Sequence, residues 1–324
     1  MLIPPNPQKK CPAQIREKIR KEVIMKGKGF FSLSVTAILC LSLLSTYSFA
    51  AEQRRPKRFA SIGDSTTEAI NAEVYGANHW ASWANGYHGF WQWLFGLSNV
   101  NSHNQRITNK FGRWGRKNFI EAEEGADSRD LFTQAERAVA HDADYVTLLM
   151  GHNDICQDYI DEIPEADEFE ENARRALVEL RDGLREGTTI YLIGIVNVPQ
   201  LYYVAKDKKA LGIVDCEVLW FFTLFELYPC GTVLGPLRDE SDRMAMTQRI
   251  VEYNSKLQEL VQEFSEDDPN RYYYYTESVF EFSNSGFGEN HVSDLDCFHP
   301  STEGHWELSR ITWEAEDGPR FLDW

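Results

Sequence analysis

Short apolar runs in this chain alternate with longer amphipathic stretches, and this alternation limits the fold more than any other feature. Continuous apolar runs are typical of strands buried on both faces of a parallel sheet. We expect five strands, at Arg58–Ile62, Asn118–Ala122, Tyr145–Met150, Ile190–Val196 and Arg271–Thr276. One-sided apolar spacing predicts helices over 129–140, after Pro164, over 246–264 and over 302–313. This order predicts the α/β class, with three α/β/α layers around a mainly parallel, doubly wound sheet.

The charge balance of the chain is strongly acidic. Its 324 residues hold 50 Asp and Glu against 33 Lys and Arg, a formal net charge of −17. Residues 1–50 hold eight Lys and Arg and two Asp and Glu, so the remainder carries −23. Because phosphate backbones are bound mainly by Lys and Arg, this charge argues against nucleic acid and anionic membranes as partners. No repeat or linker follows residue 51, so we expect a single domain over 51–324.

The N-terminus has the pattern of an export signal. Lys26 and Lys28 precede an uncharged stretch of 23 residues, 29–51, with small residues near its end. This pattern predicts a signal peptide cleaved after Ala50, and a secreted or periplasmic mature protein. A retained anchor is the alternative, because 23 uncharged residues are long enough to span a bilayer. Met25 is an alternative start of the chain.

Polar motifs stand where a doubly wound sheet binds its ligands, after the strands. Ser65 follows the first expected strand at a strand-to-helix turn, and Asn153 follows the third. Asp296 precedes His299 by three residues, so its carboxylate can accept the imidazole Nδ1–H and direct Nε2 outward, as a general base requires. The structural alternatives are N-caps at Ser65 and Asp296 and an ordinary turn at Asn153.

Metal and cofactor motifs give no comparable pattern. The chain has no CxxC pair and no HExxH spacing, so we expect neither a metal nor another cofactor. A metal shared by His299 with His291 or His305 is the alternative.

The polar motifs, taken in order, resemble those of the SGNH hydrolases, the GDSL-type esterases and lipases. The family's blocks are matched by Gly63-Asp64-Ser65, by Gly125, by Gly151-His152-Asn153-Asp154 and by Asp296-Cys297-Phe298-His299. The third and last blocks are most similar to the phospholipase B branch. Thr66 departs from the Leu that usually follows Gly-Asp-Ser. The resemblance implies a flavodoxin-like version of the α/β/α fold.

The same resemblance implies a serine-based mechanism. Ser65 would attack an ester carbonyl, His299 would take the serine proton, and Asp296 would orient and stabilise the imidazolium. The backbone N–H groups of Ser65 and Gly125, together with the side chain of Asn153, would form the oxyanion hole.

We therefore expect an exported serine ester hydrolase that acts on lipid, phospholipid or lysophospholipid acyl esters. Its partners would be the ester substrate and, transiently, a membrane or micelle surface. An esterase that removes acetyl groups from polysaccharide would use the same site, with tryptophans as sugar platforms. A catalytically silent lipid- or sugar-binding protein is the third alternative, against which the presence of all the polar site residues argues.

Two segments lie outside the regular alternation. Residues 79–114 are rich in tryptophan and phenylalanine, which either line an acyl groove or sugar platform or fill the core beside the first helix. Residues 198–240 form either a mobile apolar lid that meets lipid or a helix packed on the body; a lid would expose Trp220, Phe221, Phe222 and Phe225. With a lid and a charge of −23, we expect a preference for zwitterionic or neutral lipids and for medium or longer acyl chains over acetate.

Four cysteines follow the N-terminal part, at Cys156, Cys216, Cys230 and Cys297, an even number that suits disulfides in an oxidising compartment. Three connectivities are open. We predict Cys216–Cys230, because it closes a short loop, and Cys156–Cys297, because both neighbour residues of the expected site.

Overall fold

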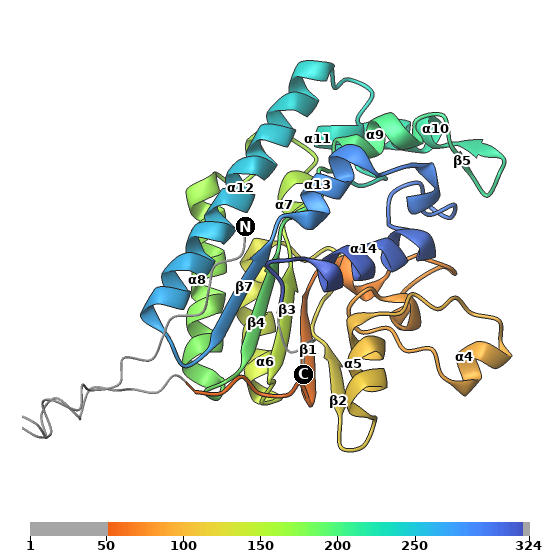
Figure 1. The fold of residues 1–324 in the computed structure, drawn as a ribbon. Helices are drawn as coiled ribbons and strands as arrows, with labels where there is room; N and C mark the ends of the chain where they lie inside the picture. The colour runs from red at the N-terminus through yellow and green to blue at the C-terminus, as the bar shows by residue number, and fades with distance from the viewer. Residues whose placement is uncertain (1–50, 320–324) are drawn as a thin grey trace, which may run out of the picture. The chain divides into compact units, whose positions relative to one another are not determined.

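A five-stranded parallel sheet forms the centre of the computed structural model, which describes residues 51–319 (Figure 1). The strands are β1 (Arg58–Gly63), β2 (Lys117–Ile120), β3 (Tyr145–Leu149), β4 (Thr189–Ile193) and β7 (Tyr272–Thr276), in the order β2-β1-β3-β4-β7. All five expected strands are confirmed, with ends that differ by up to three residues. The expected signal peptide, its cleavage after Ala50 and the alternative start at Met25 lie outside the described residues.

Helices cover both faces of the sheet. One face carries α6 (Leu131–Ala140), α8 (Ala166–Gly183) and α12 (Glu240–Asp267); the other carries α5 (His103–Phe111), α13 (Ser278–Ser285) and α14 (Thr302–Glu314) (Figure 1). Side chains alternate along β1, so that Ala60 and Ile62 are buried with the first layer and Phe59 with the second. Helices therefore shield both faces of the sheet from water, which explains why β3 is buried along its whole length. The predicted three-layer, doubly wound fold is confirmed.

The long helices have the starts and apolar faces that the sequence indicates. α8 begins two residues after Pro164, with one buried face that includes Phe169 and Leu177. α12 begins earlier than expected because the Asp239 carboxylate caps it, accepting the Asp242 N–H at 3.0 Å. α14 begins after Ser301, whose hydroxyl accepts the Gly304 N–H at 3.1 Å.

Short elements make up the rest of the described chain. They are α3 (Ser65–Glu68), α4 (Phe90–Leu94), α7 (His152–Ile155), α9 (Gln200–Ala205), the antiparallel pair β5 (Lys209–Ala210) and β6 (Val214–Asp215), α10 (Cys216–Trp220) and α11 (Gly231–Leu234). Turns of 3₁₀ helix lie at His79–Ala81, Ser128–Asp130, Ile160–Glu162, Phe221–Phe225 and Glu289–His291. Within residues 51–319, no helix is both long enough and apolar enough to cross a membrane.

The segment 198–240 is a series of short helices with one small hairpin. Trp220 is buried and donates its Nε1–H to the carbonyl oxygen of Cys297 at 3.3 Å, as the packed alternative expects and contrary to the lid alternative. Phe221, Phe222 and Phe225 are exposed as expected. Two disulfides attach the segment to neighbouring loops, which opposes the large displacement of a mobile lid.

Both disulfide pairings predicted from the sequence are wrong, although all four cysteines do form disulfides. The bonds join Cys156 to Cys230 and Cys216 to Cys297. Cys230 lies beside the loop after β3, where the Thr232 N–H donates to the carbonyl of Gln157 at 3.0 Å. The chain between Cys216 and Cys230 thus runs from the loop before α14 to the segment after β3. The disulfide partners are therefore set by where the cysteines lie in the fold and not by the length of the loop between them.

Candidate active site

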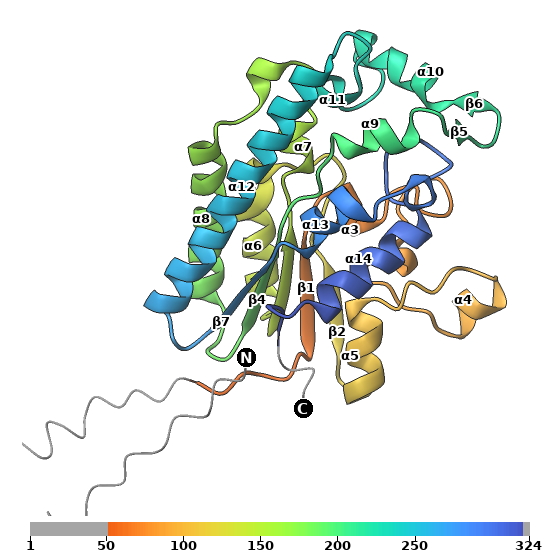
Figure 2. The same ribbon diagram turned by 45° about the horizontal axis from the view of Figure 1, so that its top comes forward.

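The short helices α3, α7 and α9 and the helix α13 lie at the carboxyl edge of the sheet (Figure 2). Residues of these helices line a pocket over the carboxyl ends of four strands. The empty space in and above it, open solvent included, is about 770 Å³. The polar side chains on its wall are Ser65 and Thr66 after β1, His152 and Asn153 after β3, Asn197 after β4, Ser283 on α13, and His291 and His299 before α14. Most of the remaining lining is apolar and includes Val196, Val198, Leu201, Val279, Phe282, Phe287, Phe298 and Leu308. In this sheet the chain adds β2 on one side of β1 and then β3 on the other, so the direction of strand addition reverses between β1 and β3. The pocket includes this point of reversal, where a doubly wound sheet is expected to bind its ligands.

The turn that carries Ser65 is tightly held. Gln134 accepts the Gly63 N–H at 2.8 Å and donates to the Gly63 carbonyl at 2.9 Å. A Cβ at Gly63 would lie 2.4 Å from Oγ1 of Thr67, so the close packing of this turn requires glycine. The N-cap of α3 is Asp64, whose carboxylate accepts the Thr66 N–H at 2.8 Å. The N-cap alternative for Ser65 is therefore wrong, and Ser65 lines the pocket as the first residue of the helical turn.

His299 and Asp296 form a hydrogen-bonded dyad. Nδ1 of His299 lies 2.6 Å from Oδ2 of Asp296, which also accepts the side-chain N–H of Asn71 at 2.7 Å. Burial raises the pKa of Asp296, but the hydrogen bonds from His299 and Asn71 outweigh it, and the net pKa is below its ordinary value. The carboxylate is therefore ionised and able to stabilise an imidazolium. The N-cap of α14 is Ser301, so the N-cap alternative for Asp296 is wrong.

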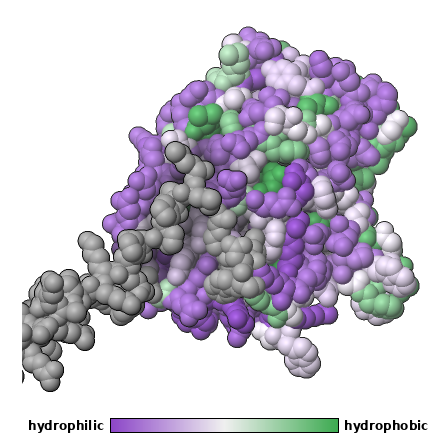
Figure 3. Space-filling model, viewed as in Figure 1, coloured by the Kyte–Doolittle hydropathy of each residue, from purple (hydrophilic) through white to green (hydrophobic). Residues whose placement is uncertain are grey.

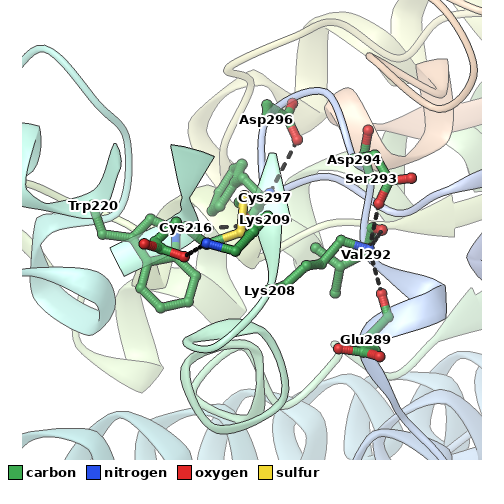
Figure 4. Close-up of a disulfide and its surroundings, with 12 residues drawn as sticks. Lys208, Lys209, Cys216, Trp220, Glu289, Val292, Ser293, Asp294, Asp296 and Cys297 are labelled. Carbon is green, nitrogen blue, oxygen red and sulfur yellow. Dashed lines mark hydrogen bonds and ion pairs between the residues drawn. A yellow bond between two sulfur atoms is a disulfide. The ribbon is translucent and has the colours of Figure 1, made fainter. Parts of the chain in front are cut away.

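The loop that carries this dyad is supported by the segment 198–240 (Figure 4). Cys297 is bonded to Cys216, and its carbonyl accepts the Trp220 Nε1–H at 3.3 Å. The Tyr228 hydroxyl donates to the carbonyl of Asp296. On the preceding turn, Lys208 donates to the carbonyls of residues 289 and 292 at 2.7 and 2.8 Å. The segment 198–240, for which the sequence left a lid and a packed helix open, thus holds the loop of the dyad in place.

Asn153 faces the pocket from the loop after β3. One of its amide hydrogens is donated to the carbonyl of Ala126 at 2.8 Å. The preceding Gly151 has φ of 130°, and a Cβ there would lie 2.2 Å from Cδ1 of Ile195, so the turn requires glycine. Gly125 adopts φ of 78° in the neighbouring loop but is not among the pocket-lining residues.

Sequence reasoning missed a second histidine–carboxylate pair. Nδ1 of His152 lies 2.6 Å from Oδ2 of Asp64, and its buried Nε2 has no hydrogen-bond partner. This contact joins the turn before Ser65 to the turn before Asn153. The sequence did contain a signal for this pair, because Asp64 directly precedes Ser65 and His152 directly precedes Asn153. The contact of Asn71 with Asp296 spans 225 positions and has no comparable signal.

A buried carboxyl group follows Asn153 in α7. Asp154 is fully buried, and one of its oxygens accepts the Ser128 N–H at 2.9 Å. Burial raises the pKa of Asp154 to about 7, against the opposing hydrogen bonds from Ser128.

The metal alternative finds no support in the geometry. His291 lines the pocket, whereas His305 is fully buried. Burial, and to a smaller extent repulsion from His299, lowers the pKa of His305 to about 3. Among residues 51–319, no group of three or more His, Cys, Asp and Glu side chains is arranged to hold a metal ion.

The aromatic segment 79–114 contributes no residue to the pocket wall. Trp83 is part of the core, as one of the two interpretations expected. Five aromatic residues of this segment are instead exposed, so they neither fill the core nor line the pocket: Phe90, Trp91, Trp93, Phe95 and Trp114.

A pocket with both polar and apolar walls at the carboxyl edge of a five-stranded, doubly wound parallel sheet defines an α/β protein whose ligand site lies at the ends of its strands. Residues 60–310 match the family model of the GDSL-like lipases/acylhydrolases. The chain belongs to this family of ester hydrolases. Among curated proteins, no match is found.

The solved structures that are similar to the chain include a lipase-like protein, a carbohydrate esterase and a lipase. One is a proposed GDSL-like lipase from Parabacteroides merdae, with 15% identity, TM-score 0.48, and coverage of 81% of this chain and 96% of that one. A family 3 carbohydrate esterase from Clostridium thermocellum has 12% identity, TM-score 0.43, and coverage of 79% and 93%. An extracellular lipase from Streptomyces rimosus has 14% identity, TM-score 0.37, and coverage of 77% and 94%.

Proposed function

We propose that the protein hydrolyses carboxylic esters through a Ser65–His299–Asp296 triad. One observation carries the proposal: Ser65 and His299 line the same pocket, while Asp296 occupies Nδ1 of His299 and so leaves Nε2 for proton transfer. The ionised state of Asp296 suits the imidazolium that forms during the reaction.

The proposed reaction has two halves. Oγ of Ser65 attacks the ester carbonyl as His299 takes the hydroxyl proton, and His299 then returns that proton to the leaving alcohol. Water, activated by the same histidine, hydrolyses the acyl-enzyme and frees Ser65. Asp296 keeps the imidazole in one tautomer and orientation throughout.

The oxyanion hole is proposed to combine the Ser65 and Gly125 N–H groups with the side chain of Asn153. An amide nitrogen carries two hydrogens, and Ala126 accepts one from Asn153, so the second is available to the substrate oxygen. Loss of one such donor typically costs about 3–4 kcal/mol of transition-state stabilisation.

Lipid or phospholipid acyl esters are the proposed substrates. Eight residues of the pocket wall are valine, leucine or phenylalanine, and their side chains would be left in contact with water by an acetyl group but covered by a longer acyl chain. We expect dodecanoate and octanoate esters and lysophospholipid to be hydrolysed faster than acetate esters or acetylated xylan. A preference for acetylated sugar would support the carbohydrate esterase instead.

The pocket wall offers a sharper test of chain length. Phe282→Ser should lower kcat/KM for a dodecanoate ester by about tenfold while changing acetate hydrolysis little, because only the long chain reaches the apolar wall. Phe225→Ser is the control, since Phe225 is exposed and lies outside the pocket. Equal losses on both esters would contradict the proposed acyl site.

A fluorophosphonate probe separates an active enzyme from a silent binding protein. We expect labelling of the wild type at Ser65 and no labelling of Ser65→Ala. An unlabelled wild type would support the silent alternative.

We further propose that the mature protein is a single exported hydrolase domain that starts after Ala50. Two disulfides suit an oxidising compartment. N-terminal sequencing of protein recovered outside the cytoplasm should begin at Ala51; a retained leader would support the anchor alternative.

A further inference from the structure

Helix α4 projects from the side of the molecule on two loops, away from the pocket (Figures 1 and 2). Its apolar side chains, together with the next residue, are between 52% and 72% exposed: Phe90, Trp91, Trp93, Leu94 and Phe95. We call these five residues the α4 knob. In the space-filling view it forms the projection at the lower right, with green patches (Figure 3).

The α4 knob is apolar on every side except the one that Gln92 occupies. Gln92 is the one polar residue between Phe90 and Phe95, and its side chain is used locally, accepting the Gly89 N–H at 3.1 Å. The aromatic rings contact one another, with centroids 5.4 Å apart for Phe90 and Trp91 and 6.4 Å apart for Trp91 and Phe95. A partner that covered only one side would leave the others in water.

The charge around the α4 knob is opposite to that of the molecule. The 47 residues from 74 to 120 contain no Asp or Glu and five Lys or Arg, in a chain with 50 acidic residues. Lys110, Arg113 and Lys117 are exposed, and Arg113 lies over the ring of Tyr87, just before α4. The neighbouring Glu73 is engaged by the backbone and hydroxyl of Ser98, at 3.0 and 2.8 Å, and by Trp80 at 2.8 Å.

We propose that the α4 knob docks the protein on an anionic lipid surface. A fluid interface surrounds an inserted element on all sides, which suits a short helix whose apolar side chains leave only the side of Gln92 polar. Tryptophan rings favour the headgroup level, and basic residues beside them contact anionic headgroups. This inference goes beyond the proposed hydrolysis and does not depend on it, because binding is measured without turnover.

Local charge here reverses the expectation from net charge. The −23 of the mature chain favours zwitterionic surfaces, but charges more than a Debye length away are largely screened, so Arg113, which lies over Tyr87 next to the α4 knob, contributes most at contact. Added salt should therefore weaken binding to anionic vesicles.

The test uses the full mature chain with Ser65→Ala, so that vesicles are not consumed. We expect it to float with phosphatidylcholine vesicles that contain about one third phosphatidylglycerol, and much less with phosphatidylcholine alone. Trp91→Ser/Trp93→Ser should weaken binding at least about tenfold, because the inserted rings are lost. Arg113→Gln should weaken it by about fivefold and reduce its dependence on salt, because Arg113 is the basic residue placed next to the α4 knob.

Phe222→Ser/Phe225→Ser is the matched control, since these exposed aromatic residues lie in the acidic remainder of the chain. All substituted side chains are exposed, and thermal unfolding verifies that each variant folds. Three outcomes overturn the proposal: no vesicle binding by the parent protein, equal binding after the tryptophan substitutions, or a larger loss in the control. Concentration-dependent self-association that the tryptophan substitutions abolish would identify a second copy of the chain as the partner instead.

Discussion

Removal of the Cys216–Cys297 disulfide should weaken the fold and, separately, the catalytic dyad. The two cysteines are 81 positions apart, for which the chain-entropy relation gives a loss of about 4.5 kcal/mol in the free energy of unfolding. In a domain of this size, that loss lowers Tm by about 9–18 °C. A bond between Cys216 and Cys230 would instead close a short loop, and its loss would cost about 3 kcal/mol.

The effect on turnover follows from the position of Cys297, two residues before His299. Without the disulfide, the hydrogen bonds from Trp220 and Tyr228 still hold the carbonyls of the loop, so we expect a displaced rather than a disordered dyad. Displacement of a reacting group by about 1 Å can cost on the order of 10²-fold. Cys216→Ser/Cys297→Ser should therefore lower kcat at least about tenfold at a temperature where it remains folded.

The second disulfide supplies the control. Cys156 and Cys230 are 74 positions apart, so Cys156→Ser/Cys230→Ser should lower stability by the same amount, about 4.5 kcal/mol. Its kcat should fall less, because Ala126 still accepts a hydrogen from Asn153. Urea unfolding and hydrolysis of an octanoate ester measure the two effects, and non-reducing peptide mapping verifies the pairs. Equal losses of kcat in both variants, or a change in Tm of only a few degrees, would refute the reasoning.

Three further predictions concern single residues. Ser65→Ala and His299→Ala should each abolish ester hydrolysis with little change in Tm, and Asn153→Ala should keep a residual rate, about 10²–10³-fold below wild type; full activity of Ser65→Ala would exclude it as the nucleophile. The folded state holds the Asp154 proton up to about pH 7, whereas an unfolded carboxyl releases it near pH 4, so this group favours the folded state at low pH and that contribution is lost as pH rises. As pH rises from 4 to 7, the free energy of unfolding of Asp154→Asn should therefore increase by about 4 kcal/mol relative to that of the wild type, measured by urea unfolding. A difference between the two proteins that does not change with pH would contradict this. Gly151→Ala should lose about 1–3 kcal/mol of stability, because its Cβ would lie 2.2 Å from Ile195, and unchanged unfolding would show that the turn can relax.

The strands, the long helices and the layer order could be predicted from the sequence, because burial imposes a local periodicity that each segment carries by itself. The positions of Ser65, Asn153 and the Asp296–His299 motif followed from the same logic, since each comes directly after a strand or before a helix. Their roles in catalysis remain proposals.

The tertiary structure decided whatever depends on residues distant in sequence. The short loop between them favoured a bond between Cys216 and Cys230, yet this segment connects two different parts of the site. Cys216 therefore bonds to Cys297 before α14, and Cys230 bonds to Cys156 after β3. Only the folded chain brings Asn71 to Asp296, 225 positions away. Composition alone could not separate the buried Trp83 from the exposed aromatic residues of the α4 knob, because a tryptophan has the same apolar ring in either place. Burial is a property of the packed surroundings, and these exist only after distant segments have come together.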